Sequence, residues 1–354
     1  GCCGSGPSWT AVSPIFRLRA GGSASTEVRV LVTGGAGFIG SNLVRLLIAQ
    51  PEIERVVNLD ALTYAGHRES LADIDDPRHV FEQVDLRHRD RVVEVFRRHN
   101  PTHVLHLAAE SHVDRSIAAP ADFIHTNVVG SFHLLEAARA NGLERLVHVS
   151  TDEVYGSLGP DGRFSEHTPY APRSPYSASK AAGDMLTRGY HHTYGLPTVV
   201  TNCSNNYGPY QHPEKLIPVV IAAALRDDPI PVYGDGLHVR DWLHVQDHCR
   251  ALWCVLTRGR VGETYNVAAN NEWVNLHLVE RIADAVDAHL GRRVGQSREL
   301  IRFVPDRPGH DRRYAIDATK IQTELGWRPE RSFEQGIADT VTWYAEHANW
   351  VAAV

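Results

Sequence analysis

The chain has 354 residues, of which 43% are hydrophobic and 22% charged, a composition typical of a globular protein with one large domain or two fused ones. A formal net charge of −6 argues against a nucleic-acid partner, and the absence of a long apolar run argues against a membrane span. Five cysteines without zinc-site spacing, and histidines without a metal pattern, predict a protein of a reducing compartment, the cytoplasm, with no metal site.

The chain order then predicts three parts. Residues 1–26 are rich in Gly and Ser without periodicity, and we expect a disordered extension there. Residues 27–204 form a first domain and residues 205–354 a smaller lobe that partly returns to the main sheet. In the first domain, β-branched runs that predict strands alternate with amphipathic stretches that predict helices. The strands are expected at 28–32, 55–59, 80–84, 104–107, 146–149 and 198–203, and the helices at 38–50, 90–99, 121–141 and 176–194. This alternation predicts an α/β fold, a Rossmann-like doubly wound parallel sheet.

A glycine-rich loop joins the first predicted strand to the first helix. Its glycines are Gly34, Gly37 and Gly40, a spacing that lets backbone amides approach a pyrophosphate at a helix N-terminus. A plain turn would look similar, but the strand-loop-helix context favours dinucleotide binding. Asp60 closes the second strand, where a carboxylate binds both ribose hydroxyls and repels a 2′-phosphate. No Arg follows it directly, so we expect NAD, with Asp85 near the adenine.

Tyr176 and Lys180 form a Y-x-x-x-K pair in a predicted helix. Residues four apart share a helix face, so the ammonium is expected to lower the pKa of the phenol and make it a usable base. After a Rossmann half, this pair resembles the short-chain dehydrogenase/reductase superfamily. That superfamily places a Ser or Thr after the fifth strand, and Thr151 fits.

Two acids, Asp152 and Glu153, follow Thr151 at the end of the fifth strand. Buried carboxylates need a partner or a task. A dehydratase has such a task, because loss of water from a sugar C6 needs one acid and one base. Neighbours in an extended chain point to different sides, so the two carboxyls are expected to meet different substrate atoms with different pKa values. The residues alone leave open which is the acid.

Longer blocks carry a closer resemblance, to the nucleoside-diphosphate-glucose 4,6-dehydratases. They cover about residues 28–330 and include STDEVYG at 150–156, YSASKAAGD at 176–184, NCSNNYGPYQHPEKLIP at 202–218, VYGDGLHVRDWLHVQDH at 232–248 and PDRPGHDRRYAID at 305–317, together with residues 107–114. The chain departs from the family at Ala61 and at residues 267–269, and neither departure removes a catalytic group.

The resemblance implies an enzyme that converts a nucleoside-diphosphate glucose, with dTDP-glucose expected, to the 4-keto-6-deoxy sugar nucleotide and water. It implies a tightly bound NAD that is regenerated in each turnover, and a homodimer. In the implied mechanism Tyr176 is the base at the 4-hydroxyl, Lys180 and Thr151 assist it, Glu153 removes the C5 proton and Asp152 protonates the 6-hydroxyl. The first domain would bind NAD and the smaller lobe the sugar nucleotide.

The resemblance also implies two sets of binding residues. The NAD set is Gly34, Gly37, Phe38, Ile39, Gly40, Asp60, Leu62, Thr63, Asp85, Leu86, Leu107, Ala108, Ala109, Ser111, Thr126, Tyr176, Lys180 and Asn206. The sugar-nucleotide set is Ser111, Thr151, Asn205, Lys215, Leu216, Pro231, Val232, Tyr233, Arg240, Asn275, Asp306, Arg307 and His310. The basic members of the second set suit a diphosphate bridge, although any one of them alone could be scattered surface charge.

Two other classes of function stay open. Another NAD-dependent sugar-nucleotide enzyme, such as a UDP-sugar 4-epimerase, a decarboxylase or a UDP-glucose 4,6-dehydratase, would use the same fold, but an epimerase leaves Asp152 and Glu153 without a task. A non-catalytic NAD-binding regulatory protein would not need Tyr176 and Lys180. The nucleotide base and the pathway cannot be read from spacing.

Overall fold

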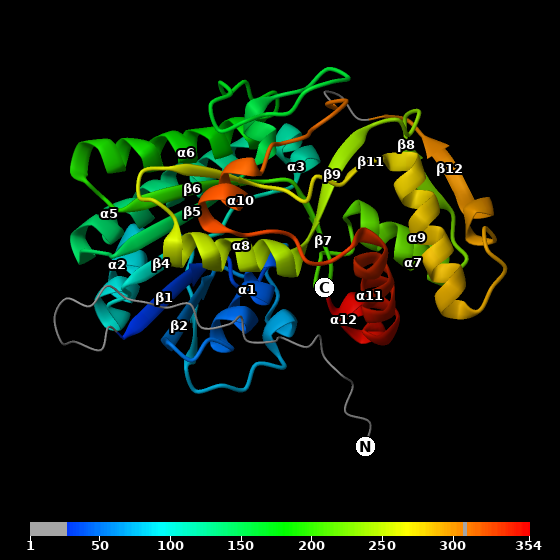
Figure 1. Ribbon diagram of the computed structural model, residues 1–354. Helices are drawn as coiled ribbons and strands as arrows, with labels where there is room; N and C mark the ends of the chain where they lie inside the picture. Colours follow the sequence, from blue (N-terminus) through cyan, green and yellow to red (C-terminus); the bar gives the residue numbers. More distant parts are fainter. Residues whose placement is uncertain (1–26, 307–309) are drawn as a thin grey trace.

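The computed structural model describes residues 27–306 and 310–354, which form two lobes around a shared cavity (Figure 1). The larger lobe is built on a seven-stranded sheet in the order β10-β6-β5-β4-β1-β2-β3, with every neighbouring pair parallel. The strands are β1 Val28–Thr33, β2 Ile53–Asp60, β3 His79–Gln83, β4 His103–His106, β5 Arg145–Thr151, β6 Thr198–Cys203 and β10 Thr264–Val267. The predicted Rossmann-like doubly wound fold is confirmed.

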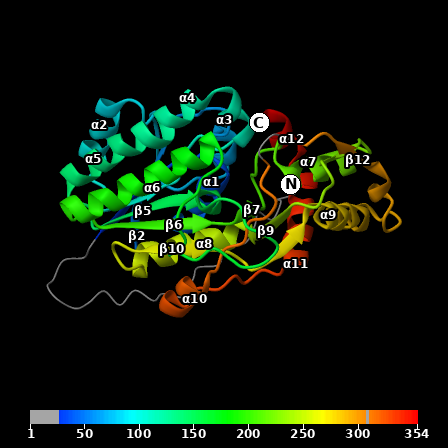
Figure 2. The ribbon, with the colours of Figure 1, turned by 90° about the horizontal axis from the view of Figure 1, so that it is seen from above.

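Helices cover both faces of this sheet, which explains why its central strands are apolar on both sides (Figure 2). Alternate residues of β1 show the division: Val30 and Val32 join the core under α1 and α8, whereas Leu31 joins the core under α2 and α5. The helices of this lobe are α1 Phe38–Ile48, α2 Arg89–His99, α3 Val113–Ala118, α4 Pro120–Phe123, α5 Ser131–Asn141, α6 Pro175–Tyr194, α8 Val245–Arg258 and α10 Thr319–Leu325, with short 3-10 turns η1 Arg68–Leu71 and η3 Asp152–Tyr155.

The helix predicted over 121–141 contains an irregularity that periodicity did not indicate. It runs through α4, a π-helical segment η2 (Ile124–Gly130) and α5 without a break in helical dihedral angles. A Cβ on Gly130 would lie 3.0 Å from the Cβ of Leu86, so the segment passes close to the end of the third strand. π-helical turns inside α-helices are often found at functional sites, and Thr126 of this segment lines the cavity.

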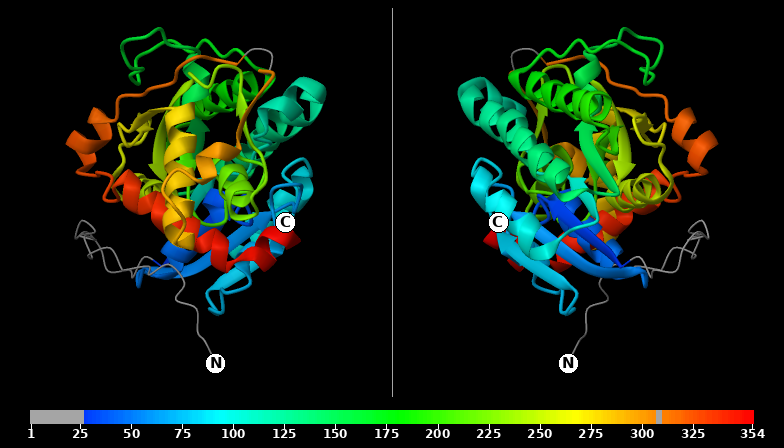
Figure 3. Two further views of the ribbon diagram at one scale, coloured as in Figure 1. Left: turned by 90° about the vertical axis from the view of Figure 1, so that its right-hand side faces the viewer. Right: turned by 90° about the vertical axis from the view of Figure 1, so that its left-hand side faces the viewer.

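The smaller lobe has its own apolar core, which includes Trp242, Leu278 and Trp343. It contains a three-stranded sheet, β11-β9-β7, and a parallel pair, β12-β8. The strands are β7 Asn205–Tyr207, β8 Ile230–Tyr233, β9 Val239–His244, β11 Glu272–Val274 and β12 Ile301–Val304, and the helices are α7 Leu216–Leu225, α9 Asn275–Leu290, α11 Phe333–Glu346 and α12 Ala348–Ala353, with the 3-10 turn η4 Ser297–Leu300. Figure 1 shows these helices beside the main sheet, and Figure 3 looks along the line between the lobes, with the smaller lobe in front in the left panel and behind in the right panel.

Segments from the second half of the chain also join the larger lobe. β10 pairs with β6 at the edge of the main sheet, and α8 packs against α1 beneath it. The predicted extension 1–26 lies outside the described residues, and the predicted boundary between 204 and 205 stays a prediction.

Within the described ranges, no helix combines the length and the apolar character needed to cross a membrane.

Candidate active site

One cavity of about 580 Å³ lies at the carboxyl ends of the main sheet's strands and extends between the lobes. The order of the sheet changes direction between β4 and β1, and doubly wound sheets bind ligands at such a point. All residues of the two predicted binding sets line this cavity except Leu62, Asp306 and Arg307. Arg307 lies outside the described residues. The parallel sheet therefore brings together side chains from almost the whole length of the chain.

The glycine loop is shaped by close backbone contact. Gly34 has φ +72°, a conformation that L side chains rarely adopt, and its amide donates to the Leu59 carbonyl of β2. A Cβ on Gly40 would lie 2.1 Å from the Gly34 carbonyl oxygen, so helix α1 can approach the loop only with glycine there. The N-cap Gly37 offers no side chain to the first-turn amides of α1, which leaves them for an anionic ligand.

Asp60 connects this loop to β2. One carboxylate oxygen accepts from the Ala36 amide at 2.9 Å and the other from the Leu62 amide at 2.8 Å. Burial raises the pKa of Asp60, although both hydrogen bonds oppose the rise. A Cβ on Gly66 would lie 2.5 Å from the same carboxylate, so a side chain at position 66 would collide with Asp60. Leu62 adopts φ +54° and contributes its amide to Asp60, while its predicted contact with a cofactor stays a prediction. These features fit a dinucleotide, with its pyrophosphate at α1 and its ribose at Asp60.

Thr151, Asp152 and Glu153 stand where β5 ends. Strand β5 closes at Thr151, and the hydroxyl of Thr151 accepts from the Glu153 amide at 3.3 Å, which caps the 3-10 turn η3. The expectation that the two acids extend from a strand to opposite sides is therefore wrong. A 3-10 turn rotates successive side chains by about 120°, and this rotation brings both carboxyls into the cavity in different surroundings.

Asp152 is the more enclosed acid. Its side chain is 2% exposed, and burial followed by the neighbouring charge of Glu153 raises the pKa of Asp152 to about 8, despite the opposing charge of Arg240. The group is therefore protonated through the neutral range. Glu153 is only half-buried. Two adjacent carboxyls thus differ in environment, as an acid and base pair requires.

Tyr176 enters the cavity from the first turn of α6. The helix start is fixed by a capping box between Ser174 and Ser177, with Pro175 in the first turn. Lys180, one turn on, donates from Nζ to the Val149 carbonyl at 2.8 Å. Burial raises the pKa of Tyr176 well above its ordinary value, the charge of Glu153 raises it further, and the hydrogen bond with Thr151 opposes the rise. This direction is opposite to the one predicted from the Y-x-x-x-K spacing.

Arg240 is a basic residue that several contacts hold on the lobe side of the cavity. Its guanidinium donates to the backbone carbonyls of Val239 and Asp311, each at 2.8 Å, and lies 4.4 Å above the ring of Tyr314. It is buried and lines the cavity. A guanidinium fixed in this way suits recognition of a phosphate or carboxylate.

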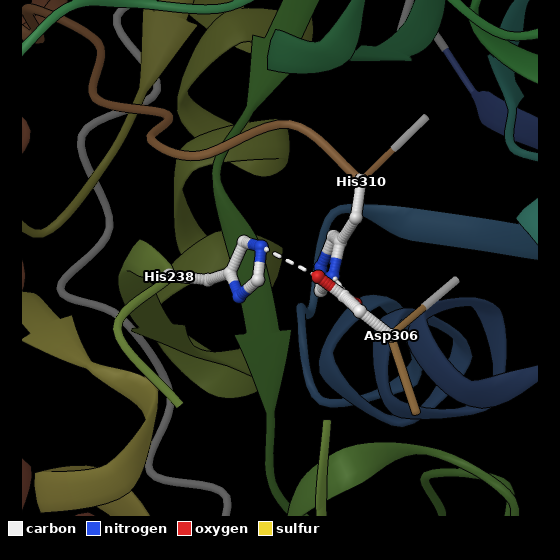
Figure 4. Close-up of side chains that lie close together, drawn as sticks. All are labelled: His238, Asp306 and His310. Atoms are coloured by element: carbon white, nitrogen blue, oxygen red, sulfur yellow. Dashed lines mark hydrogen bonds and ion pairs between the residues drawn. The ribbon is translucent and has the colours of Figure 1, made fainter. Parts of the chain in front are cut away.

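A second feature of the lobe side is the group His238, Asp306 and His310 (Figure 4). The two imidazole rings stack at 3.7 Å with an interplanar angle of 16°, and the Asp306 carboxylate lies 2.7 Å from His310 Nδ1 and 3.4 Å from His238 Nε2. The donor atoms of all three lie within 4.8 Å of one another, which would allow a metal ion. In stacked rings, however, the nitrogen lone pairs run nearly parallel and do not converge on one point. The expectation of no metal site stays a prediction, and the group serves to hold His310 at the cavity wall.

Sequence reasoning missed some residues of the site. His238 is one, because it stacks on His310 at the cavity wall. His112, His212 and Glu214, which line the cavity, are three more. His112 Nε2 lies 3.5 Å from a Glu214 carboxylate oxygen, which connects the loop after β4 to the start of the smaller lobe. The block at 202–218 contained His212 and Glu214, but only the fold brings them to His112.

The fold, the dinucleotide-shaped loop and the Thr-Tyr-Lys group define an enzyme of the short-chain dehydrogenase/reductase class. The family model for GDP-mannose 4,6 dehydratase matches residues 31–340. The chain is 57% identical to a dTDP-glucose 4,6-dehydratase of Xanthomonas campestris, over 92% of this chain and 95% of that protein. It belongs to the GDP-mannose 4,6 dehydratase family.

Solved structures agree on the fold. A dTDP-glucose 4,6-dehydratase of Streptomyces venezuelae, solved with NAD bound, superposes with a TM-score of 0.85 at 48% identity and covers 91% of this chain and 98% of its own. A UDP-glucose 4-epimerase of Thermus thermophilus in complex with NAD superposes with a TM-score of 0.81 at 34% identity, over 90% of this chain and 100% of its own. The fold alone therefore does not separate dehydratase from epimerase.

Gly40→Ala tests the dinucleotide fit. The added methyl group would meet the Gly34 carbonyl, so we expect the dissociation constant for NAD to rise at least tenfold, with a loss of about 1–3 kcal/mol in unfolding free energy from overpacking. Gly189→Ala is the matched control, because Gly189 lies inside α6 with nothing within 4 Å of a Cβ. It should leave NAD affinity unchanged. Isothermal titration calorimetry measures the NAD affinity of the two variants and of the parent. Equal NAD affinity of the Gly40 variant and the parent would contradict the assignment.

Proposed function

We propose that this chain is an NAD-dependent dTDP-glucose 4,6-dehydratase, which converts dTDP-glucose to the 4-keto-6-deoxy sugar nucleotide and water. The observation that carries the proposal is the pair of unequal carboxyls, Asp152 and Glu153, beside Tyr176 in a single cavity. Of these three groups, the oxidation of an alcohol needs only Tyr176. An elimination of water also needs an acid and a base that reach two neighbouring carbons of the sugar. The close relatives carry the same activity in their names.

The first step is proton removal from the sugar 4-hydroxyl. Tyr176 takes this proton, and the hydroxyl of Thr151, which is hydrogen-bonded to the phenol, orients the substrate oxygen. Lys180 supplies a positive charge one helical turn from the phenol. Bound NAD⁺ would accept the C4 hydride, return it to C6, and favour the phenolate through its positive nicotinamide.

The second step is the elimination of water across C5 and C6. A ketone at C4 makes the C5 proton acidic, and Glu153 removes it. Asp152, which is protonated at neutral pH because its pKa is raised to about 8, donates its proton to the departing 6-hydroxyl. The different burial of the two carboxyls supports this division of roles, and it agrees with the roles implied by the resemblance. The Glu153 carboxyl exchanges its proton with solvent and then reprotonates C5. The proton that Tyr176 gained passes to solvent and Asp152 takes one up from solvent, which restores both groups and completes the turnover.

The binding residues divide between the two lobes in this proposal. Residues 27–204 hold NAD through the loop of Gly34, Gly37 and Gly40 and through Asp60. Residues 205–354 hold the diphosphate and nucleoside, with Lys215, Arg240 and His310 at the cavity wall as the basic partners of the diphosphate. A nearby second candidate is a sugar-nucleotide 4-epimerase, which the structural likeness to the Thermus thermophilus enzyme favours.

Isotope labels distinguish the two candidates. With dTDP-glucose deuterated at C4, we expect the label at C6 of the product, because NAD returns the same hydride, and solvent deuterium at C5. Mass spectrometry and proton NMR of the product report both positions. Label retained at C4 in a product that keeps its 6-hydroxyl would instead establish the epimerase.

Asp152→Asn tests the acid. The amide preserves size but cannot donate a proton, so we expect water loss to slow by roughly 10²–10⁴-fold, while NAD content and formation of the 4-ketone persist. In the parent enzyme the elimination rate should fall as pH rises through about 8, because the raised pKa of Asp152 means that the proton is present below that value and lost above it. Quenched single-turnover assays across pH measure the rate.

The control for that variant is Asp161→Asn, since Asp161 is exposed on a loop. It should behave as the parent in every assay. If Asp152→Asn instead lowers the thermal midpoint strongly and loses NAD, Asp152 is structural and the assignment as acid fails.

We further propose that two copies associate through α5 and α6. These helices and η2 pack side by side and expose apolar side chains, with Ile124 47%, Phe132 40% and Met185 51% exposed. Monomers seldom leave large exposed apolar patches, and a twofold interface would bury the same patch on both copies.

We also propose that the enzyme works in the cytoplasm, as its buried free cysteines suggest, and cell fractionation tests that placement.

Charge placed on this surface should separate the copies. We expect light scattering to give twice the chain mass of 39.3 kDa for the parent and a single chain mass for the variant Phe132→Asp with Met185→Asp, because carboxylates would be buried unpaired. Val294→Asp, at a 70% exposed position on the smaller lobe, is the control and should stay dimeric. A dimeric double variant would place the interface elsewhere.

A further inference from the structure

A row of functional groups runs along one face of α6. Tyr176, Lys180, Asp184 and Arg188 are spaced four residues apart, so each lies one turn from the next. The proposed mechanism uses the first two and leaves Asp184 without a task. Asp184 is nevertheless fully buried, at 0% exposed. A carboxylate in that position must be paired or hydrogen-bonded, or be used.

Asp184 is surrounded by donors from three elements. Its Oδ2 accepts from the hydroxyl of Ser150 on β5 and that of Tyr170 in the following loop, each at 2.9 Å, and from the amide of Asn202 on β6 at 3.4 Å. His148 Nε2 lies 3.1 Å from Oδ1. Burial alone would raise the pKa of Asp184, but His148, the ammonium of Lys180 and the hydroxyl of Ser150 outweigh it and hold the pKa below its ordinary value. Asp184 is therefore a carboxylate.

Lys180 needs a negative partner. It is buried, and its ammonium donates a hydrogen bond to the Val149 carbonyl, which carries no charge. Burial lowers the pKa of Lys180, and the charge of Asp184 opposes this fall most strongly. A buried ammonium with no counter-charge would tend to lose its proton. Lys180 must keep that proton to act on Tyr176.

We propose that Asp184 is a positioning residue for the catalytic pair: its carboxylate, held by Ser150 and Tyr170, keeps the Lys180 ammonium charged and in place one turn below Tyr176. The effect of Asp184 on catalysis rests on the proposed function. The electrostatic pairing of Asp184 with Lys180 does not. Asp184 touches neither substrate nor cofactor in this assignment, since it does not line the cavity formed by the described residues.

Other ionisable groups face this pair, and none replaces Asp184. Arg188 reaches Tyr170 at 2.8 Å and is cationic like Lys180. His106 on β4 and His148 on β5 are neutral, because burial lowers the pKa of each. Burial raises the pKa of Tyr155, that of Tyr170 and that of the Cys203 thiol, so these groups are also uncharged at neutral pH. Asp184 thus supplies the negative charge at the inner side of Lys180.

The direct test is the pKa of Lys180 in the dinucleotide-free enzyme. The chain has three lysines, Lys180, Lys215 and Lys320, so competitive acetylation followed by mass spectrometry can follow each one across pH. We expect Asp184→Asn to lower the pKa of Lys180 by at least one unit and to leave Lys215 and Lys320 unchanged as internal references. Asp184→Glu, which keeps the charge, should restore most of the parent value. An unchanged Lys180 in a folded Asn variant overturns the proposal.

The catalytic consequence is tested by a double-mutant cycle on C4 oxidation. Asp184→Asn should move the alkaline limit of activity to lower pH, because Lys180 loses its proton sooner, while KM changes less than twofold. In a Lys180→Met background the same substitution should have no further effect on the pH profile. A purely structural role predicts the opposite, a uniform loss at all pH values that adds to the effect of Lys180→Met.

The outcomes separate this inference from the proposed function. If the parent enzyme does not oxidise dTDP-glucose at C4, the proposed function fails, while the acetylation experiment still decides the pairing. If oxidation occurs but Lys180 titrates alike in the parent and the Asn variant, only the role of Asp184 fails. Should Asp184→Asn not fold, Asp184→Ser, whose hydroxyl can still bond Ser150 and Tyr170, takes its place in both assays.

Discussion

The chemistry of this site depends on ionisable side chains that are buried together where β5 and α6 meet. Asp152, Tyr176, Lys180 and Asp184 are all enclosed, and a protein interior accepts such groups only when each is neutral or paired. Asp152 is kept protonated and Tyr176 is kept a neutral phenol, and in our proposal the charge of the Asp184 carboxylate, one helical turn away, balances that of the Lys180 ammonium. The resting site therefore holds a proton on Asp152 that can be donated. The phenol of Tyr176 needs a further positive charge nearby before it can lose its proton.

The parallel sheet makes this arrangement possible. Because all seven strands run in one direction, the end of β5, the glycine loop after β1 and the polar turn after β6 open on the same cavity. The main-chain bends at these ends are local: Gly34 takes a positive φ and η3 is capped by Thr151. The helices that cover the sheet then fix the side chains, and α6 does so through the capping box at its start.

Features that depend on neighbouring residues could be predicted from the sequence, and features that depend on burial or long-range contact could not. The glycine loop, Asp60 and the pair Tyr176 and Lys180 were recognised from local patterns, and the residues of all three line the cavity. The direction of the pKa shift of Tyr176 was wrong because spacing shows the nearby ammonium but not the burial, which outweighs it. His238 was missed because Asp306 and His310 follow it only after two helices and several strands. The strand continuation through Asp152 was wrong because the capping bond from Thr151 turns the chain.

The raised pKa of Tyr176 has a consequence for the order of events. A phenol that stays protonated in the empty enzyme cannot act as a base, so in the proposed mechanism Tyr176 would become a base only when bound NAD⁺ adds its positive charge. Asp152 is under the opposite constraint, because burial and the neighbouring charge of Glu153 raise its pKa to about 8, so that the empty site already holds this proton at neutral pH. The acid is thus prepared before the base is. In the proposed mechanism, elimination needs the ketone that Tyr176 would help to form, so oxidation has to come before water loss, and the buried position of Asp152 at the end of β5 keeps its proton available until that ketone is present.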